Sequence, residues 1–149
     1  MAEQLTVLGT GFAVATKCYT TCFTISDGEE HFMIDTGGGS GVLTNLETLN
    51  ISYNQVHHIF LSHCHTDHVM GVVWMLRMIG QSMQKGVYEG NLHLYCHKDI
   101  ADGVLSIYSA TASDEYHVAV ASGELNGSDR QPFRGYERYI HALTVLGQH

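Results

Sequence analysis

The chain has 149 residues, of which 44% are apolar and only 15% are charged, and its formal net charge is −8. This length and apolar content are enough for the core of one domain. The excess of acidic residues excludes an extended polyphosphate-binding surface, which needs a basic face, although one phosphate held by a metal stays compatible with it. Eleven histidines stand out, because histidine is the commonest metal ligand.

The apolar runs end well short of the ~20 residues that a membrane-spanning helix needs, so no transmembrane segment is expected. The first five residues, Met1-Ala2-Glu3-Gln4-Leu5, are acidic and lead into a strand-like segment, which predicts no signal peptide. The four cysteines fit neither a zinc ribbon nor a dense disulfide framework. We therefore expect a cytoplasmic protein with reduced thiols.

The first predicted elements form an antiparallel opening. Alternation over residues 5–8, ending at Gly9-Thr10-Gly11, predicts a strand that enters a tight loop. Residues 20–25 and 31–34 predict two more strands joined by a turn. Four glycines within residues 35–41 allow a sharp turn. A helix is then expected over residues 42–49, with Asn50 at its end.

The middle of the chain predicts alternating strands and helices. Residues 56–61 end in a continuous apolar run, which indicates a strand buried on both faces. After a polar segment, residues 69–79 have helical spacing, and Gly80 is expected to end that helix. A polar loop, a strand and a short helix follow, over residues 81–91, 92–95 and 100–108. This order is typical of an α/β layered fold.

Metal-ligand side chains cluster between the buried strand and the next helix, in the segment Ser62-His63-Cys64-His65-Thr66-Asp67-His68. His63 and His65 are two residues apart, so an extended or tightly turned backbone can aim both imidazoles at one point. Asp67 and His68, at the helix start, can aim at a second point nearby. Three imidazoles and a carboxylate suit Zn²⁺, and also Mn²⁺ or Fe²⁺. A solvated histidine cluster is the alternative, and the strand and helix on either side favour metal binding.

Three segments together resemble the metallo-β-lactamase fold, and within it the ribonuclease Z-like branch. They are Leu8-Gly9-Thr10-Gly11, Met33-Ile34-Asp35-Thr36-Gly37-Gly38-Gly39, and the histidine motif with its flanks from His57 to Gly71. The resemblance implies an αββα sandwich of the α/β class. Residues 1–105 would form the N-terminal half of such a domain, and residues 106–149 a divergent or truncated tail. Residues 116–120 and 139–146 are weak strand candidates in that tail.

The resemblance also implies roles for the motif residues. His63 and His65 would bind one metal ion, and Asp67 and His68 a second. In this family the metal pair activates a bridging water and clamps the scissile oxygen, and Asp67 would orient the nucleophile or act as base. The family's third histidine, bridging aspartate and final histidine lie further along. His141 is near the expected distance, and it is left open between a ligand and a strand or surface histidine.

Residues outside the motif carry weaker expectations. Asp35, at a strand end before glycines, is expected to accept a hydrogen bond from the motif loop or from a ligating imidazole. The alternative is an aspartate that only caps its turn. His57 and His58 are expected at a solvated strand entrance, and His93 with its imidazole pointing outward.

Two hypotheses about function follow. The first is a metal-dependent hydrolase, a ribonuclease Z-like phosphodiesterase in which a metal-activated water attacks a phosphodiester. Its substrate would be a small phosphodiester or an RNA 3′ end, and the net charge of −8 favours the small one. The second is a non-catalytic half-domain that binds one metal weakly, or that needs a partner chain to complete its fold. A homo-oligomer is compatible with both hypotheses, and neither involves a membrane.

Overall fold

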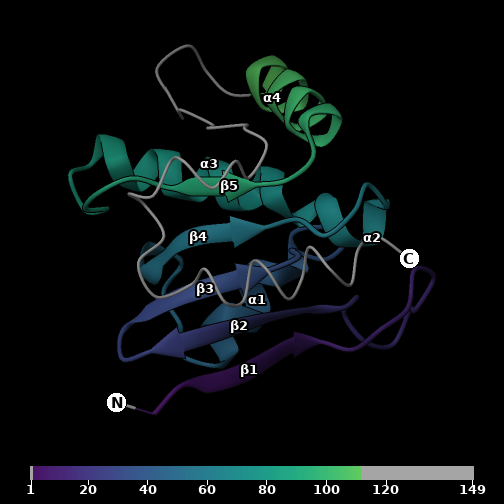
Figure 1. Cartoon of the computed structure of the whole chain (residues 1–149), viewed down its shortest axis with the longest axis horizontal. Coiled ribbons are helices and arrows are strands. Elements are labelled where there is room, and N and C mark those ends of the chain that lie inside the picture. The colour runs from purple at the N-terminus through teal and green to yellow at the C-terminus, as the bar shows by residue number, and fades with distance from the viewer. Residues whose placement is uncertain (1, 112–149) are drawn as a thin grey trace, which may run out of the picture.

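The computed structural model describes residues 2–111, which form a five-stranded sheet with helices packed against it (Figure 1). The strand order across the sheet is β1-β2-β3-β4-β5. The predicted sequence of strands and helices is confirmed over these residues, with two short helical turns added. None of the helices in this part of the chain has the length and apolar character needed to span a bilayer.

The first three strands are antiparallel neighbours: β1 (Gln4–Gly9), β2 (Cys22–Asp27) and β3 (Glu30–Ile34). The turn between β2 and β3 needs Gly28, whose φ of 83° is a left-handed conformation that glycine adopts without strain. The predicted antiparallel opening is therefore present. The long connection between β1 and β2 folds back along the edge of the sheet, with a bridge between Gly11 and Thr20.

The next two strands run parallel to β3: β4 (Val56–Phe60) beside it, and β5 (His93–Tyr95) beyond β4. Ile34 lies opposite Phe60 in this register. Because parallel strands end at the same edge of the sheet, the residues that follow β3 and β4 lie next to each other there. Two backbone bonds extend the pairing beyond the strands, from Asp35 N to Phe60 O at 2.8 Å and from Leu61 N to Tyr95 O at 2.8 Å.

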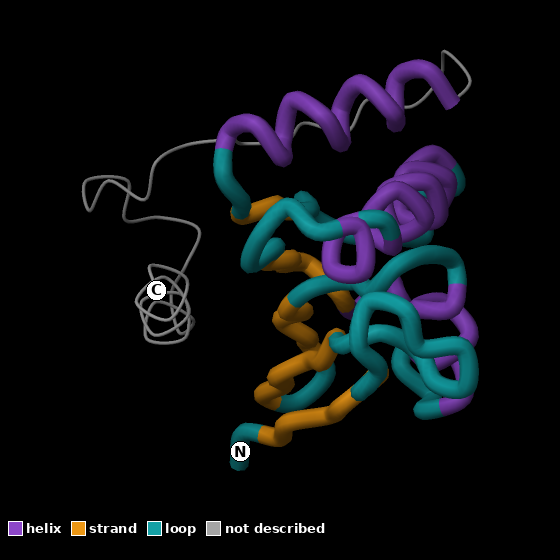
Figure 2. The backbone as a smooth tube through the Cα atoms, turned by 90° about the vertical axis from the view of Figure 1, so that its right-hand side faces the viewer, coloured by secondary structure: helices purple, strands orange, loops and turns teal. Residues whose placement is uncertain are grey.

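The helices are α1 (Gly41–Thr48), α2 (Thr66–Val69), α3 (Gly71–Gln84) and α4 (Lys98–Thr111), with a 3-10 turn η1 (Tyr53–Gln55) before β4. Helices α1 and α3 lie on one face of the sheet (Figure 2). The main core forms between them and the sheet, around Met33, Val42, Leu46, Ile59, Met75, Leu76 and Ile79. A second cluster of Phe32, Ile34, Phe60 and Tyr95 lies on the opposite face.

The expected end of the third helix at Gly80 is wrong. Helix α3 continues to Gln84, and Gly80 is buried within it. The residue that stops the helix is Gly86, whose φ of 67° gives the left-handed conformation found after many helix ends. The end of the helix is closed by the carbonyl of Ser82, a buried residue, which accepts from the amides of Val87 and Tyr88 at 2.9 and 3.2 Å.

The solvated strand entrance predicted at His57 and His58 is also wrong. Both histidines are partly buried. The His58 ring stacks on His93 with centroids 5.1 Å apart, and its Nδ1 is hydrogen-bonded to the Tyr95 hydroxyl at 2.9 Å. The stack forms because these residues face the same side of the neighbouring strands β4 and β5. Burial and the neighbouring His93 and His57 imidazoles lower the pKa of His58 to about 4.

Several predictions lie outside the described residues. These are the strand candidates at 116–120 and 139–146 and the question of His141. The predicted boundary between residues 105 and 106 falls within α4, so the division of the chain into 1–105 and 106–149 stays a prediction. The four cysteines are free thiols.

Candidate metal centre

The histidine motif lies at the edge of the sheet where β3 and β4 end. Asp35 follows β3 directly, and Ser62 and His63 come just after β4. A short turn then leads into α2, which holds Asp67 and His68. Ligand sites in open α/β sheets form at the carboxyl ends of parallel strands. The parallel pairing of β3 with β4 therefore brings together side chains that are about thirty positions apart in the sequence.

The three motif imidazoles are gathered rather than splayed apart. The His63 ring centroid lies 4.6 Å from that of His65 and 4.1 Å from that of His68. His68 Nε2 lies 3.2 Å from Asp67 Oδ2. Donors bound to one tetrahedral Zn²⁺ at ~2.0 Å lie about 3.3 Å apart, so this last distance suits a shared ion.

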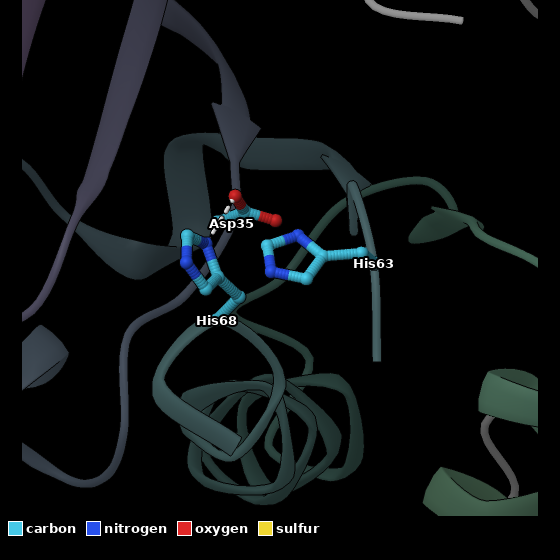
Figure 3. A group of neighbouring side chains, drawn as sticks. All are labelled: Asp35, His63 and His68. Atoms are coloured by element: carbon cyan, nitrogen blue, oxygen red, sulfur yellow. Dashed lines mark hydrogen bonds and ion pairs between the residues drawn. The ribbon is translucent and has the colours of Figure 1, made fainter. Parts of the chain in front are cut away.

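Asp35 is the hub of the hydrogen bonding (Figure 3). Its Oδ1 accepts from the Ser62 amide at 2.8 Å, and its Oδ2 accepts from the Ser62 hydroxyl and from His68 Nδ1, both at 2.7 Å. The predicted hydrogen bonds from the motif loop and from a motif imidazole are thus both present. The carboxylate is buried, with a relative exposure of 5%. Since both oxygens are already occupied by donors, this network orients the motif.

These bonds determine which nitrogen of each imidazole carries the proton. An ionised carboxylate only accepts, so the Ser62 hydroxyl donates to Asp35 and can then only accept from His63 Nδ1, at 2.8 Å. His68 Nδ1 likewise donates to Asp35. With Nδ1 engaged in this way, Nε2 is the nitrogen that each neutral imidazole can offer to a metal, which is the arrangement typical of metal-ligating histidines.

The backbone at Asp35 has a positive φ of 54°. Few residues other than glycine adopt this left-handed region, and aspartate and asparagine are the most enriched of them. The next residue, Thr36, donates from both its amide and its hydroxyl to the His68 carbonyl, at 2.9 and 3.0 Å. The loop after β3 is thus bonded to the start of α2 through side chain and backbone.

The electrostatics favour neutral imidazole at His63. Burial, followed by the neighbouring His68 imidazole, lowers the pKa of His63. Neutral imidazole is the form that binds metals. At His68, the lone pair on Nε2 faces the Asp67 carboxylate at 3.2 Å, and two such acceptors repel each other unless a proton or a metal cation lies between them.

The structure brings His63 and His68, two of the four residues predicted as ligands, into one possible metal-binding group, and its third member is Asp35, which was predicted only as a supporting residue. His65 and Asp67 lie beside this group without belonging to it. Asp35, His63 and His68 each offer a ligand atom, and these atoms lie within 4.8 Å of one another. His65 is exposed and Asp67 is buried. The sequence analysis gave no role to Ser62 or Thr36. Their hydroxyl contacts with Asp35 and His68 depend on strand pairing, and only their position beside predicted site residues could have indicated them.

A family model described as anti-Pycsar protein Apyc1 matches residues 3–112. The chain belongs to this family. The matched range includes every residue of the network around Asp35, together with all the described strands and the whole of α4.

The Apyc1-family chain is also similar to curated ribonuclease Z proteins. It is 28% identical to that of Phocaeicola vulgatus over 98 residues, which cover 65% of this chain and 30% of the relative. It is 32% identical to that of Bacteroides thetaiotaomicron over 78 residues, which cover 52% of this chain and 24% of the relative. The chain therefore spans about 30% of the length of these relatives.

Solved structures show the same fold. Human tRNase Z, short form, matches with a TM-score of 0.66 and 21% identity over 80% of this chain and 43% of that one. The metallo-β-lactamase fold protein YhfI from Bacillus subtilis matches with a TM-score of 0.60 and 22% identity over 82% of this chain and 47% of that one. The predicted metallo-β-lactamase fold and ribonuclease Z-like resemblance are confirmed.

Proposed function

We propose that the chain contributes the site of a metal-dependent hydrolase that cleaves a small phosphodiester. His63 and His65 would hold one divalent ion, and Asp67 and His68 a second, with Zn²⁺ favoured over Mn²⁺ or Fe²⁺ by the three imidazoles. When bound, a metal pair supplies an activated water and a clamp for the attacking and leaving oxygens. The similarity of the chain to curated ribonuclease Z proteins supports this class of reaction.

The observation that carries the proposal is the pair of imidazoles whose Nδ1 atoms are held by the buried Asp35 carboxylate, directly at His68 and through Ser62 at His63. Nε2 is then the atom of each ring that is left to bind an ion. The Asp67 carboxylate faces His68 Nε2 at 3.2 Å. We propose that Asp67, besides binding metal, orients the nucleophile or takes its proton.

The charge of the chain supports a small substrate rather than a long RNA. A net charge of −8 with seven basic residues leaves little positive surface for a nucleic-acid backbone. An RNA 3′ end, which the name ribonuclease Z suggests for the relatives, is the competing substrate. The family model is described as an anti-Pycsar protein. This description supports the further proposal that the whole protein acts against Pycsar.

Metal analysis and a phosphodiesterase assay test this proposal together. We expect about two ions per chain and metal-dependent turnover of a bis-aryl phosphodiester, and we expect loss of turnover by at least a hundredfold in His65→Ala. His97→Ala is the matched control, because His97 is an exposed histidine whose ion-pair partner is Asp99 and not a motif residue. Equal and negligible turnover in wild type and His65→Ala at micromolar protein would contradict the proposal.

The second candidate is a half-domain that needs another chain. It is favoured by one finding: the chain covers 43% of human tRNase Z and 47% of YhfI. A half-domain would bind one ion or none, and would gain metal and activity only when a partner or a second copy completes the site. Sedimentation of the purified chain with and without Zn²⁺, beside the metal analysis, separates this candidate from a complete enzyme.

A further inference from the structure

Tyr19, in the connection between β1 and β2, reaches into the loop that follows β3. Its hydroxyl lies 2.9 Å from the Thr36 carbonyl and 2.6 Å from the Gly39 carbonyl, and it accepts from the Gly39 amide at 3.1 Å. One hydroxyl thus serves three backbone groups on one loop. Tyr19 is partly buried. Water therefore has limited access to these backbone groups, and the hydroxyl supplies their hydrogen bonds instead.

The aromatic ring of Tyr19 fills space that two glycines leave. A Cβ at Gly37 would lie 2.3 Å from Tyr19 Cε1, and a Cβ at Gly41 would lie 2.6 Å from Cδ2. Real Cβ atoms do not approach so closely, so the tyrosine and the glycines require each other. The ring and the hydroxyl together define the path of the loop from Thr36 to Gly41.

That loop is bonded directly to the backbone of the histidine motif. Thr36 donates from its amide and its hydroxyl to the His68 carbonyl, and the Gly37 carbonyl accepts from the Gly71 amide at 2.9 Å. Thr36 therefore joins the two sets of bonds, because Tyr19 holds its carbonyl while its amide and hydroxyl donate to the His68 carbonyl.

We propose that the Tyr19 hydroxyl is a positioning group for His68, acting through Thr36 and Gly37. Its effect on metal binding rests on the function proposed above, whereas its effect on the backbone does not. A ligand site has to be held to within about 0.5 Å by supporting groups. Loss of the hydroxyl removes the one proton that the Thr36 and Gly39 carbonyls share and the acceptor of the Gly39 amide, so the loop is held less firmly relative to α2.

The test compares Tyr19→Phe with Tyr88→Phe. The Tyr88 hydroxyl also bonds to the backbone, and donates to the Val56 carbonyl at 3.0 Å. Val56 lies at the opposite end of β4 from the motif. Both changes keep the ring and remove one hydroxyl. Two readouts are needed: amide hydrogen exchange of Thr36 and Gly71 by NMR in metal-free protein, and the affinity for Zn²⁺ by competition calorimetry.

We expect Tyr19→Phe, relative to Tyr88→Phe, to speed exchange at Thr36 and Gly71 by at least tenfold at equal global stability. We also expect it to weaken Zn²⁺ binding by roughly tenfold, the low end for loss of a supporting group. Equal exchange at these amides in the two variants would overturn the proposal. If neither the wild type nor either variant binds Zn²⁺, the proposed function fails. The exchange data then still decide the role of Tyr19.

Discussion

Asp35 satisfies two demands at one position. Its backbone adopts the left-handed region at φ 54°, which costs a residue with a side chain on the order of 1 kcal/mol. Its carboxylate accepts from the Ser62 amide, the Ser62 hydroxyl and His68 Nδ1. Such strain persists only where the surroundings hold it, and here the three donors and the backbone bond to Phe60 hold it.

Asp35→Asn separates these two demands. Asparagine keeps the size and tolerates the left-handed backbone, but its amide group presents donors to the Ser62 hydroxyl or to His68 Nδ1. We expect the fold to persist and the affinity for Zn²⁺ to fall by roughly 10- to 100-fold, because His68 loses the acceptor that orients it. Calorimetric titration with Zn²⁺ measures this.

The matched control for that variant is Asp102→Asn. Asp102 is an exposed residue of α4 that pairs with Lys98, and surface pairs of this kind contribute at most about 1 kcal/mol. An unchanged Zn²⁺ affinity in Asp35→Asn would show that the carboxylate charge does not orient the motif.

The sequence predicted the motif residues because they are contiguous and of unmistakable ligand type. It also predicted the kind of bond that Asp35 makes, since an acidic residue at a strand end before glycines has few other uses. It could not predict Tyr19 or Thr36, because a hydroxyl becomes a positioning group only through residues far away in the chain. The proximity of Tyr19 to Gly39 depends on how the connection after β1 folds back over the sheet.

Helix α3 begins where its first residue meets the loop after β3. A Cβ on Gly71 would lie 2.0 Å from the Thr36 carbonyl oxygen and 2.8 Å from the Thr36 carbonyl carbon. These are backbone atoms that cannot rotate aside. The absence of a side chain at Gly71 is therefore what lets α3 and the motif dock on the sheet edge.

Gly71→Ala is expected to destabilise the protein by roughly 1–3 kcal/mol, the usual range for overpacking. Gly103→Ala is the matched comparison, because Gly103 lies in α4 with open space around its Cα. That change should stabilise the protein by about 0.5–1 kcal/mol, the helix preference of alanine over glycine. Urea unfolding of both variants measures the two values, and equal signs would refute the steric argument.

The elements themselves were mostly predictable from apolar spacing and turn residues. The continuous apolar run at the end of β4 correctly indicated a strand buried on both faces. The prediction at Gly80 was wrong because the sequence does not distinguish a glycine that ends a helix from a glycine packed inside one. The lengths of α3 and α4 were set by packing and capping that local pattern does not encode.

The sheet carries a partly buried histidine stack on the face opposite α1 and α3. The His58 ring stacks against those of His93 and Tyr95, and burial with the neighbouring His93 and His57 imidazoles lowers its pKa to about 4. Burial also lowers the pKa of His93 and of His31. In the unfolded chain these groups titrate near 6.5, so the native state binds fewer protons below that pH.

The free energy of unfolding should therefore be constant above about pH 6.5 and should fall between pH 6.5 and 4. Each proton contributes a slope of up to about 1.4 kcal/mol per pH unit. His58→Gln should reduce this slope, and His97→Gln, at an exposed position, should leave it unchanged. Urea unfolding at several pH values in the presence of EDTA tests this, and equal slopes in His58→Gln and wild type would count against it.

The parallel crossover from β3 through α1 to β4 has a further consequence. Helices α1 and α3 both start at the edge where β3 and β4 end, at Gly41 and Gly71. Each helix carries about half a positive elementary charge at its start from its aligned peptide dipoles. The positive ends of these two dipoles lie at the edge that also holds the Asp35 and Asp67 carboxylates, and they offset part of that negative charge in a molecule whose net charge is −8. Because helix-dipole interactions are screened by salt, rising ionic strength should weaken this compensation.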